Sequence, residues 1–284
     1  MKEDHIEKIA IKKTKHVLKF PHFATLILLA FVLVVIHLTR GNVESQNLVE
    51  KEQIGGKWVY DNSSYPLYKE EQCSFMENDF ACETYGRKDL KYQNWRWQPH
   101  HCNLPRFNGT ALLEKLRGKK LIFVGDSLNR NQWKSMLCLI DSYLPPLSNK
   151  SVVLEGNLLK FASDVNNVVC RSTMWSTDHT CYKETEPNWD EKYWPSGANR
   201  GMMEIVESTI EKLSKRGVKV EYLNITQLSA YREDGHPSVH RTFWNAISKE
   251  QLKNITLFAD CMHWCLPGVP DVWNQILYSY IINS

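Results

Sequence analysis

Apolar and polar residues are arranged differently at the start of this 284-residue chain and in the rest of it. Residues 23–38 read FATLILLAFVLVVIHL, an uncharged stretch that with its apolar neighbours approaches the ~20 residues needed to span a bilayer. Five lysines within 8–19 place the N-terminus in the cytoplasm by the positive-inside rule. A cleaved signal peptide is the alternative, but the long charged lead and the lack of a small-x-small cleavage site favour a retained anchor. The pattern predicts a cytoplasmic tail over 1–22, a transmembrane anchor over 23–40 and a stem over 41–54, with the remainder luminal.

Beyond residue 55 the patterning becomes that of a globular protein, in two parts. Residues 55–109 show little helical or strand periodicity and are rich in aromatic residues, cysteine and turn-forming residues. This composition predicts an irregular, disulfide-rich region with short strands. Over 110–284 short apolar runs alternate with segments of helical periodicity, which is typical of α/β domains.

The second part yields a series of predicted elements. Residues 110–117 predict a short helix ended by Gly118, and the apolar run 121–124 predicts a strand buried on both faces. After Ser127, apolar side chains recur at i, i+3, i+4 and i+7, which predicts a helix. The remaining predictions are a hairpin over 151–162 around Glu155-Gly156, a loop over 163–198, a helix over 199–217 closed by Gly217, and a strand over 218–225.

Ser127 lies where the predicted strand gives way to the predicted helix, in the string VGDSLNRNQW. Open α/β sheets present ligands and reactive side chains beyond the carboxyl ends of their strands. The start of a helix adds free N–H groups and positive potential, which suit a developing oxyanion. Ser127 is therefore a candidate nucleophile, although Gly-Asp-Ser alone is also a common turn sequence.

Asp260 and His263, in the string DCMHWC, are the candidate partners of this serine. On one helical turn, residues three apart share a face. A carboxylate beside an imidazole would orient the ring that takes the serine proton. In the structural alternative Asp260 caps the last helix and His263 packs beside Trp264. The joint occurrence of both motifs favours a Ser–His–Asp site.

Composition and charge narrow the environment and the partners. Ten Trp and twelve Tyr serve either core packing or stacking on sugar rings. The net charge of +3 comes from residues 1–22, so nothing indicates a nucleic-acid partner. All eight cysteines follow residue 70 without C-x-x-C spacing, which predicts disulfides in an oxidising compartment and no metal site. Five N-glycosylation sequons fit the same compartment, at Asn62, Asn108, Asn149, Asn224 and Asn254.

Six strings resemble the plant trichome birefringence-like family of luminal polysaccharide O-acetyltransferases. They are GKWVYDNSSYPLY, WRWQPHHCNLPRFNG, VGDSLNRNQW, CYKETEP, LSAYREDGHPS and DCMHWCLPGVPDVWN, and the resemblance covers roughly residues 55–140 and 175–280. The strings WVYDNSSYPLYKEEQC and GRKDLKYQNWRWQPH are most similar to the xylan-acetylating branch. The resemblance implies a GDSL/SGNH-like, flavodoxin-like parallel sheet in a single-pass type II protein of the Golgi membrane.

The resemblance also implies roles for single residues. Ser127 would be the nucleophile, His263 the base and Asp260 its orienting acid. The Ser127 backbone N–H would serve the oxyanion, with Asn129 and Arg130 as further candidates. Acetyl would pass from a donor co-substrate of unknown identity to Ser127 and then to a sugar hydroxyl, with no bound cofactor or metal. Residues near the glycan would be Trp95, Arg96 and Trp97, or else these side chains belong to the core.

The chain departs from the family pattern between VGDSLNRNQW and CYKETEP. Relatives carry considerably more chain there, including the central strand beside the Gly-Asp-Ser strand and a segment with a further oxyanion donor. Only two single strands and one hairpin are predicted between residues 120 and 260, whereas a sheet ordinarily has about five or six strands. We therefore expect an internally shortened form with an incomplete sheet, which folds poorly or has reduced activity.

Two other functions share these features. The same Ser–His–Asp site would make a carbohydrate acetylesterase if water rather than a sugar hydroxyl reached the acyl-serine. A shortened chain without catalysis would be a luminal glycan-binding isoform.

Overall fold

The structure is a computed structural model that describes residues 55–145, 149–155, 158–163, 167–171, 181–190, 192–194, 199–243, 248, 250, 253–254 and 258–283. The predicted tail, anchor and stem (1–54) lie outside these residues. No helix in the described part of the chain combines the length and the hydrophobicity that crossing a bilayer requires.

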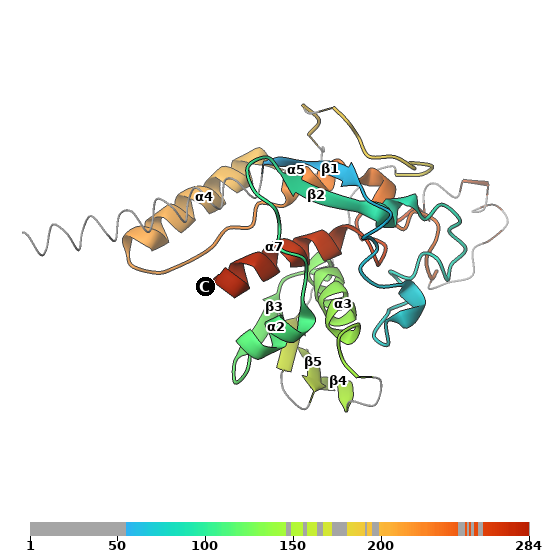
Figure 1. Ribbon diagram of the computed structural model, residues 1–284. Helices are drawn as coiled ribbons and strands as arrows, with labels where there is room; N and C mark the ends of the chain where they lie inside the picture. The colour runs from blue at the N-terminus through green and yellow to red at the C-terminus, as the bar shows by residue number, and fades with distance from the viewer. Residues whose placement is uncertain are drawn as a thin grey trace, which may run out of the picture. The chain divides into compact units, whose positions relative to one another are not determined.

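Three helices frame the main core: α2 (Gly109–Lys115), α3 (Ser127–Asp141) and α7 (Val269–Asn283). Helices α3 and α7 pack against each other (Figure 1). The Asn108 side chain caps α2, and Gly118 follows it with a positive φ of 70°, a conformation that suits glycine. The helices predicted over 110–117 and after Ser127 are thus confirmed.

A four-stranded sheet lies beside these helices. Its strands are β3 (Lys120–Val124), β4 (Lys150–Glu155), β5 (Leu158–Ser163) and β6 (Asn167–Arg171), in the order β3-β6-β5-β4. Strands β4 and β5 form the predicted hairpin. Only β3 and β6 are parallel among the described strands, so the expected parallel sheet is replaced by a mixed one. Tight returns force antiparallel pairing, whereas a parallel sheet needs a crossover for every strand.

Three further expectations fail in this sheet. Strand β6 falls inside the predicted loop 163–198, and residues 218–225 form no strand. Strand β3 is at the edge of the described sheet, and it is buried on one face only: Phe123 is buried, whereas Ile122 and Val124 are 54% and 69% exposed. Strand formation depends on a pairing partner, which local sequence does not reveal.

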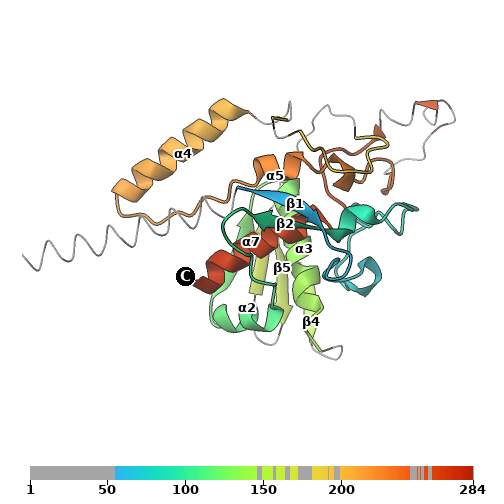
Figure 2. The same cartoon turned by 45° about the horizontal axis from the view of Figure 1, so that its top comes forward.

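The N-terminal part of the described chain is irregular, as predicted. Strands β1 (Gly56–Tyr60) and β2 (Trp95–Pro99) form an antiparallel pair in which Trp58 faces Trp97. The pair lies next to the short helix α5 (Thr226–Ala230) in both ribbon views (Figures 1 and 2). A second apolar cluster forms here, from Trp58, Trp95, Trp97, Leu228, Trp264, Val269, Val272, Trp273 and Ile276.

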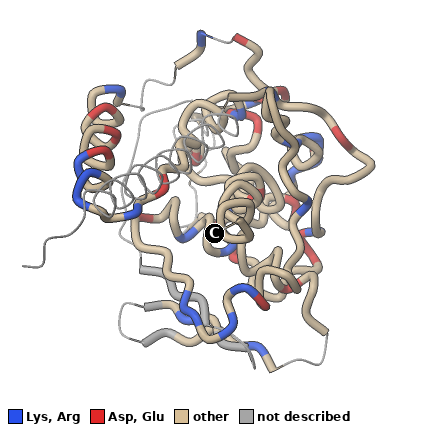
Figure 3. Tube along the Cα trace, turned by 60° about the vertical axis from the view of Figure 1, so that its left-hand side comes forward, with Lys and Arg blue, Asp and Glu red and all other residues tan. Residues whose placement is uncertain are grey.

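Helix α4 (Arg200–Lys215) confirms the helix predicted over 199–217, but it has no buried residue. Both ribbon views show it apart from the sheet and from the α3–α7 pair (Figures 1 and 2). Basic residues lie at both ends of α4 and glutamates lie between them, and charges of both signs are intermixed over the rest of the described trace (Figure 3).

Candidate active site

Ser127 is the first residue of α3, directly after the β3 strand and the Gly125-Asp126 turn. The Asp126 carboxylate caps the helix by accepting from the Leu128 N–H at 2.9 Å. A Cβ on Gly125 would lie 1.6 Å from the Asn129 side-chain oxygen, so a larger residue here would have to displace that side chain. Ser127 is 6% exposed, and its backbone N–H belongs to the helix start, where N–H groups lack intrahelical partners.

Asp260 and His263 are joined as a carboxylate–imidazole pair. His263 Nδ1 lies 2.8 Å from Asp260 Oδ2, and the other carboxylate oxygen accepts from the Met262 and His263 N–H groups at 3.0 Å each. The pair sits in a turn, not on the helical turn expected from the spacing. With Nδ1–H donating to Asp260, Nε2 keeps the lone pair that a general base needs.

Hydrogen bonds from the segment 235–238 fix the backbone of this turn. Asp260 and Ser238 exchange two backbone hydrogen bonds of 2.8 and 2.9 Å. His236 Nδ1 is 2.6 Å from the His263 carbonyl oxygen, and its ring stacks on Trp264 at 4.0 Å between centroids. Burial lowers the pKa of His236 to about 4, so it braces the turn as a neutral ring.

Two disulfides bracket His263. Cys261 pairs with Cys181 of the CYKETEP string, and Cys265 pairs with Cys82 of the N-terminal region. A third disulfide, Cys73–Cys138, ties that region to α3. These bonds confirm the disulfides expected from the cysteine count, and among the described cysteines two of the three bonds close on the five residues that contain His263.

Asn131 connects the serine helix to the histidine turn. Its side-chain oxygen accepts from the Trp264 N–H at 2.7 Å, and its amide nitrogen donates to the Trp264 carbonyl at 3.2 Å. Asn131 is one turn beyond Ser127 on α3, so both residues share the face that meets this turn. Ser127 makes no hydrogen bond to His263 among the contacts of the described residues, and substrate-free sites often have such loose geometry.

The side-chain candidates for the oxyanion have other contacts. Arg130 forms an ion pair with Glu77, which also binds the Lys134 ammonium at 2.7 Å. The Arg130 guanidinium lies 6.0 Å from the centre of the Phe80 ring, and that ring is 5.8 Å from His263. The side chain of Asn129 lies against Gly125. The Ser127 N–H is therefore the best-placed of the three candidates.

Arg241 is a site residue that sequence reasoning missed. Its Nη1 lies 3.2 Å from Asp260 Oδ2. Burial would raise the pKa of the Asp260 carboxyl, but hydrogen bonds and charge from His263 and two backbone N–H groups outweigh it and hold this pKa well below its usual value. Arg241 faces the same ionised carboxylate. Asn131 and His236 lie within the quoted strings VGDSLNRNQW and LSAYREDGHPS, whereas Arg241 lies outside all of them. The spacing of these residues does not reveal their roles, since each acts through contacts distant in sequence.

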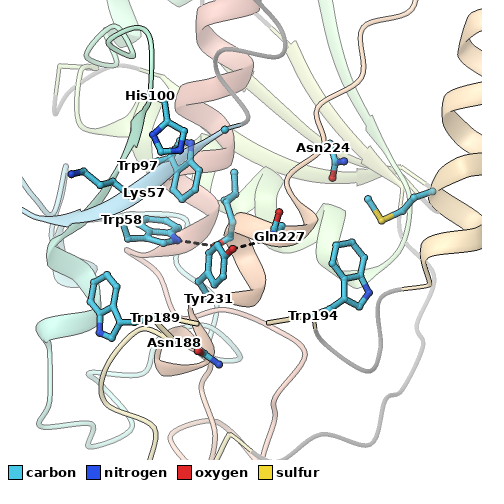
Figure 4. Close-up of a pocket in the computed structure, with 14 residues that line it drawn as sticks. Lys57, Trp58, Trp97, His100, Asn188, Trp189, Trp194, Asn224, Gln227 and Tyr231 are labelled. Carbon is cyan, nitrogen blue, oxygen red and sulfur yellow. Dashed lines mark hydrogen bonds between the residues drawn. The ribbon is translucent and has the colours of Figure 1, made fainter. Parts of the chain in front are cut away.

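The predicted glycan contacts on β2 divide between core and surface. Trp95 and Trp97 are both buried in the second apolar cluster, which agrees with the core interpretation. Trp97 also lines a pocket of about 500 Å³ (Figure 4). Arg96 pairs with Asp61 at 3.4 Å and lines a smaller hollow of about 250 Å³. None of the three is among the contacts of His263.

Four of the five sequon asparagines are exposed: Asn62, Asn108, Asn149 and Asn254. The fifth, Asn224, is half-buried, lines the 500 Å³ pocket and accepts from the Thr226 N–H at 3.4 Å. Asn108 is exposed, but its side-chain oxygen caps α2. These positions leave glycosylation a prediction and make Asn224 the least accessible acceptor.

Comparisons with known proteins show the family of this chain. The GDSL/SGNH-like acyl-esterase family found in Pmr5 and Cas1p matches residues 104–174 and 157–280, and the PMR5 N-terminal domain matches 52–103. Trichome birefringence-like proteins 35 and 34 of Arabidopsis thaliana are 36% and 35% identical to this chain, over 80% of it in each case and over 75% and 84% of their own lengths. Xylan O-acetyltransferase 12 of Oryza sativa subsp. japonica is 33% identical over 81% of this chain and 69% of its own.

The same comparisons support the predicted internal shortening. The alignment with trichome birefringence-like protein 35 extends over 338 residues although it covers only 80% of this 284-residue chain, so about a hundred residues of the relative lie opposite gaps. The acyl-esterase family also matches in two segments that overlap at 157–174. By these matches, the chain belongs to the GDSL/SGNH-like acyl-esterase family found in Pmr5 and Cas1p, together with the trichome birefringence-like proteins.

Proposed function

We propose that this chain transfers acetyl groups to hydroxyls of a plant cell-wall polysaccharide, with xylan as the first candidate. The carrying observation is the Asp260–His263 pair, fixed in a disulfide-bracketed turn that Asn131 holds against the helix of Ser127. The names of relatives as xylan O-acetyltransferases support the substrate class.

The proposed reaction has two displacements. The Ser127 hydroxyl attacks the carbonyl carbon of an acetyl ester or thioester while His263 Nε2 takes its proton. The tetrahedral oxyanion is stabilised by the Ser127 N–H, and its collapse expels the leaving group with that proton and leaves acetyl-Ser127. A sugar hydroxyl then attacks the acetyl carbonyl and gives its proton to His263, which returns it to the departing Ser127 oxygen.

Trapping of acetyl-Ser127 tests this mechanism. The full chain is incubated with p-nitrophenyl acetate, and intact mass and peptide fragmentation locate the adduct. We expect one acetyl group on Ser127 in the parent chain and none in S127A. Ser142, an exposed serine just after α3 whose hydroxyl donates to the Leu139 carbonyl at 2.8 Å, provides the control S142A, which should acetylate normally. A parent chain without the adduct, or an S127A variant with it, would contradict the proposal.

Transfer and hydrolysis are separated by the fate of the adduct. Acetyl-Ser127 is supplied with xylohexaose, and acetylated sugar is measured against free acetate. Acetylated xylohexaose as the main product supports the transferase. Free acetate alone, whether or not sugar is present, indicates the acetylesterase.

We also propose that residues 23–40 anchor the chain in the Golgi membrane with residues 55–284 in the lumen. The three disulfides and the exposed sequons support an oxidising, glycosylating compartment. Protease protection of the luminal part in sealed microsomes, together with a mass shift on removal of N-glycans, tests this topology.

A further inference from the structure

The 500 Å³ pocket is separate from the catalytic residues. Strands β1 and β2, the segment 188–194 and helix α5 supply most of its walls, and neither Ser127, Asp260 nor His263 lines it. Figure 4 shows Trp58, Trp97 and Trp189 on one side and Trp194 on the other, with Tyr231 and Gln227 between them. The pocket therefore offers several aromatic rings around one hollow.

Some of these rings are held rigidly. Trp58 is buried, donates from its indole N–H to the Leu228 carbonyl at 2.8 Å, and packs edge-on against Trp97 at 5.5 Å between centroids. Trp189 is 60% exposed, yet its ring lies 5.4 Å from Trp95. Preorganised rings bind with little loss of side-chain entropy.

The polar groups of the pocket are mostly neutral. Gln227 donates to the Tyr231 hydroxyl at 2.8 Å, and the Asn188 N–H donates to the Tyr231 carbonyl at 2.6 Å, so amide side chains and a phenol stand beside the rings. No carboxylate is among the lining residues that the structure describes, and Lys57 and His100 are the basic ones. A cationic ligand would find no carboxylate to pair with in this pocket. A polyanionic ligand would need more basic residues than these two.

A neutral sugar matches both sets of groups. Pyranose rings present apolar C–H faces that stack on aromatic side chains, and hydroxyls at their edges that exchange hydrogen bonds with amides and phenols. We propose that this pocket is a docking site for a neutral pyranose oligosaccharide, distinct from the place where acetyl is transferred. That this oligosaccharide is part of the acceptor polysaccharide rests on the proposed function.

The pocket and the turn that carries His263 share one packed cluster of apolar side chains. Trp58, Trp97 and Trp264 belong to one buried cluster, and Trp264 is the neighbour of His263. Leu128, next to Ser127, packs against the same cluster. A glycan held in the pocket would thus contact the same apolar cluster that packs beside Ser127 and His263.

Binding of xylohexaose to the full-length S127A variant tests the site without turnover. Isothermal titration compares S127A with S127A/W189A and S127A/Y60A. Tyr60 is the matched control because it is 43% exposed and packs on Trp95 at 5.2 Å, like Trp189, but does not line the pocket. We expect Trp189 removal to weaken binding about tenfold and Tyr60 removal to change it less than twofold.

A second measurement uses the full-length S127A chain without a pocket mutation, in case W189A fails to fold. The indole N–H resonances of Trp58 and Trp189 should shift on titration with xylohexaose. No binding, equal effects of the two aromatic substitutions, indole resonances that stay fixed, or tighter binding of oligogalacturonate would overturn the proposal. Because acetyl-Ser127 formation is measured separately, loss of the docking site and loss of the catalytic mechanism give different results.

Discussion

The turn that carries His263 and the strand that leads into Ser127 are stabilised to very different degrees. The turn is fixed by two disulfides, a backbone bridge to Ser238 and the amide of Asn131. Strand β3, which leads into Ser127, has an open edge in the described sheet and exposes Ile122 and Val124. About a hundred residues of trichome birefringence-like protein 35 lie opposite gaps in this chain, and the missing neighbour of β3 is expected in that stretch.

The His263 turn and the strand before Ser127 are therefore stabilised by different sets of contacts. Arg87 and Arg232 extend the support of the turn: Arg87 donates to the His236 carbonyl at 2.8 Å, and Arg232 forms a buried bidentate pair with Asp234 at 2.8 and 2.9 Å. Helix α4 has no comparable contacts, because none of its residues is buried. We therefore expect the His263 turn to stay ordered when the contacts of the four-stranded sheet are weakened.

The largest expected effect comes from the turn itself. The substitution D260N leaves the shape but removes the charge that orients the His263 ring and stabilises it when protonated. The rate of acetyl-Ser127 formation should fall by about 10³ to 10⁴-fold, with the melting temperature changed little. R241K keeps a positive charge near the same carboxylate and should lose far less. A D260N variant that acetylates at the parental rate would remove Asp260 from the mechanism.

Removal of the Cys82–Cys265 disulfide tests the support of the turn. The double variant C82S/C265S should lose about 2–5 kcal/mol of unfolding free energy in denaturant titrations. The rate of acetyl-Ser127 formation should fall beyond what the unfolded fraction explains, because Cys265 is two residues from His263. The matched control C73S/C138S removes the disulfide that ends on α3, and its rate should follow the folded fraction alone. Identical behaviour of both variants would contradict a specific role of this bracket.

Asp271 gives a pH-dependent test of the α3–α7 contact. Burial raises its pKa to about 7, although it accepts hydrogen bonds from Ser135 at 2.5 Å, Tyr68 at 3.0 Å and the Gly268 N–H at 2.7 Å. The folded chain therefore keeps a proton that the unfolded chain loses above pH ~4, so stability falls as the pH rises to about 7.

The substitution D271N removes this titration. The difference in unfolding free energy between parent and D271N should change by on the order of 2 kcal/mol between pH 4.5 and 7. His236 acts in the opposite direction from about pH 4 to 6.5, since its pKa is lowered, but it cancels in the difference between the two proteins. The exposed Asp190 supplies the control D190N, which should track the parent. A constant difference across this range would show that Asp271 does not titrate there.

The smallest effect is expected at the open strand. I122S and V124S replace exposed side chains and should change the unfolding free energy by less than about 0.5 kcal/mol, while they reduce self-association measured by light scattering. F123A, at the buried position between them, should cost about 3–5 kcal/mol. A large loss in I122S would mean that this face is covered and that the contrast between turn and sheet is wrong.

Local signals in the sequence predicted the local elements. Asn108 and Gly118 bound α2, Gly217 ends the region of α4, and the Glu155 hairpin pairs as expected. Residues 218–225 carry a strand-like pattern but have no described partner strand, so pairing rather than propensity decided their conformation.

The candidate site was likewise predictable only where its residues are close in sequence. Asp260 and His263 are close in sequence and were found by their spacing. Asn131 meets Trp264 across 133 residues, and Arg241 meets Asp260 across 19 without a motif. Those contacts arise only when the chain folds, and no pattern in a single sequence encodes them.

The side chain of Asn131 has one further consequence. A carboxamide presents a donor group and an acceptor, and here both bind the backbone of one residue of the opposing segment, Trp264. The length of the Asn131 side chain therefore helps to set the separation between the proposed nucleophile and the proposed base. Lengthening it by a methylene, as in N131Q, would change that spacing while both reacting groups stay chemically intact, so a single non-reacting position gives evolution a means to tune the distance over which the proton travels.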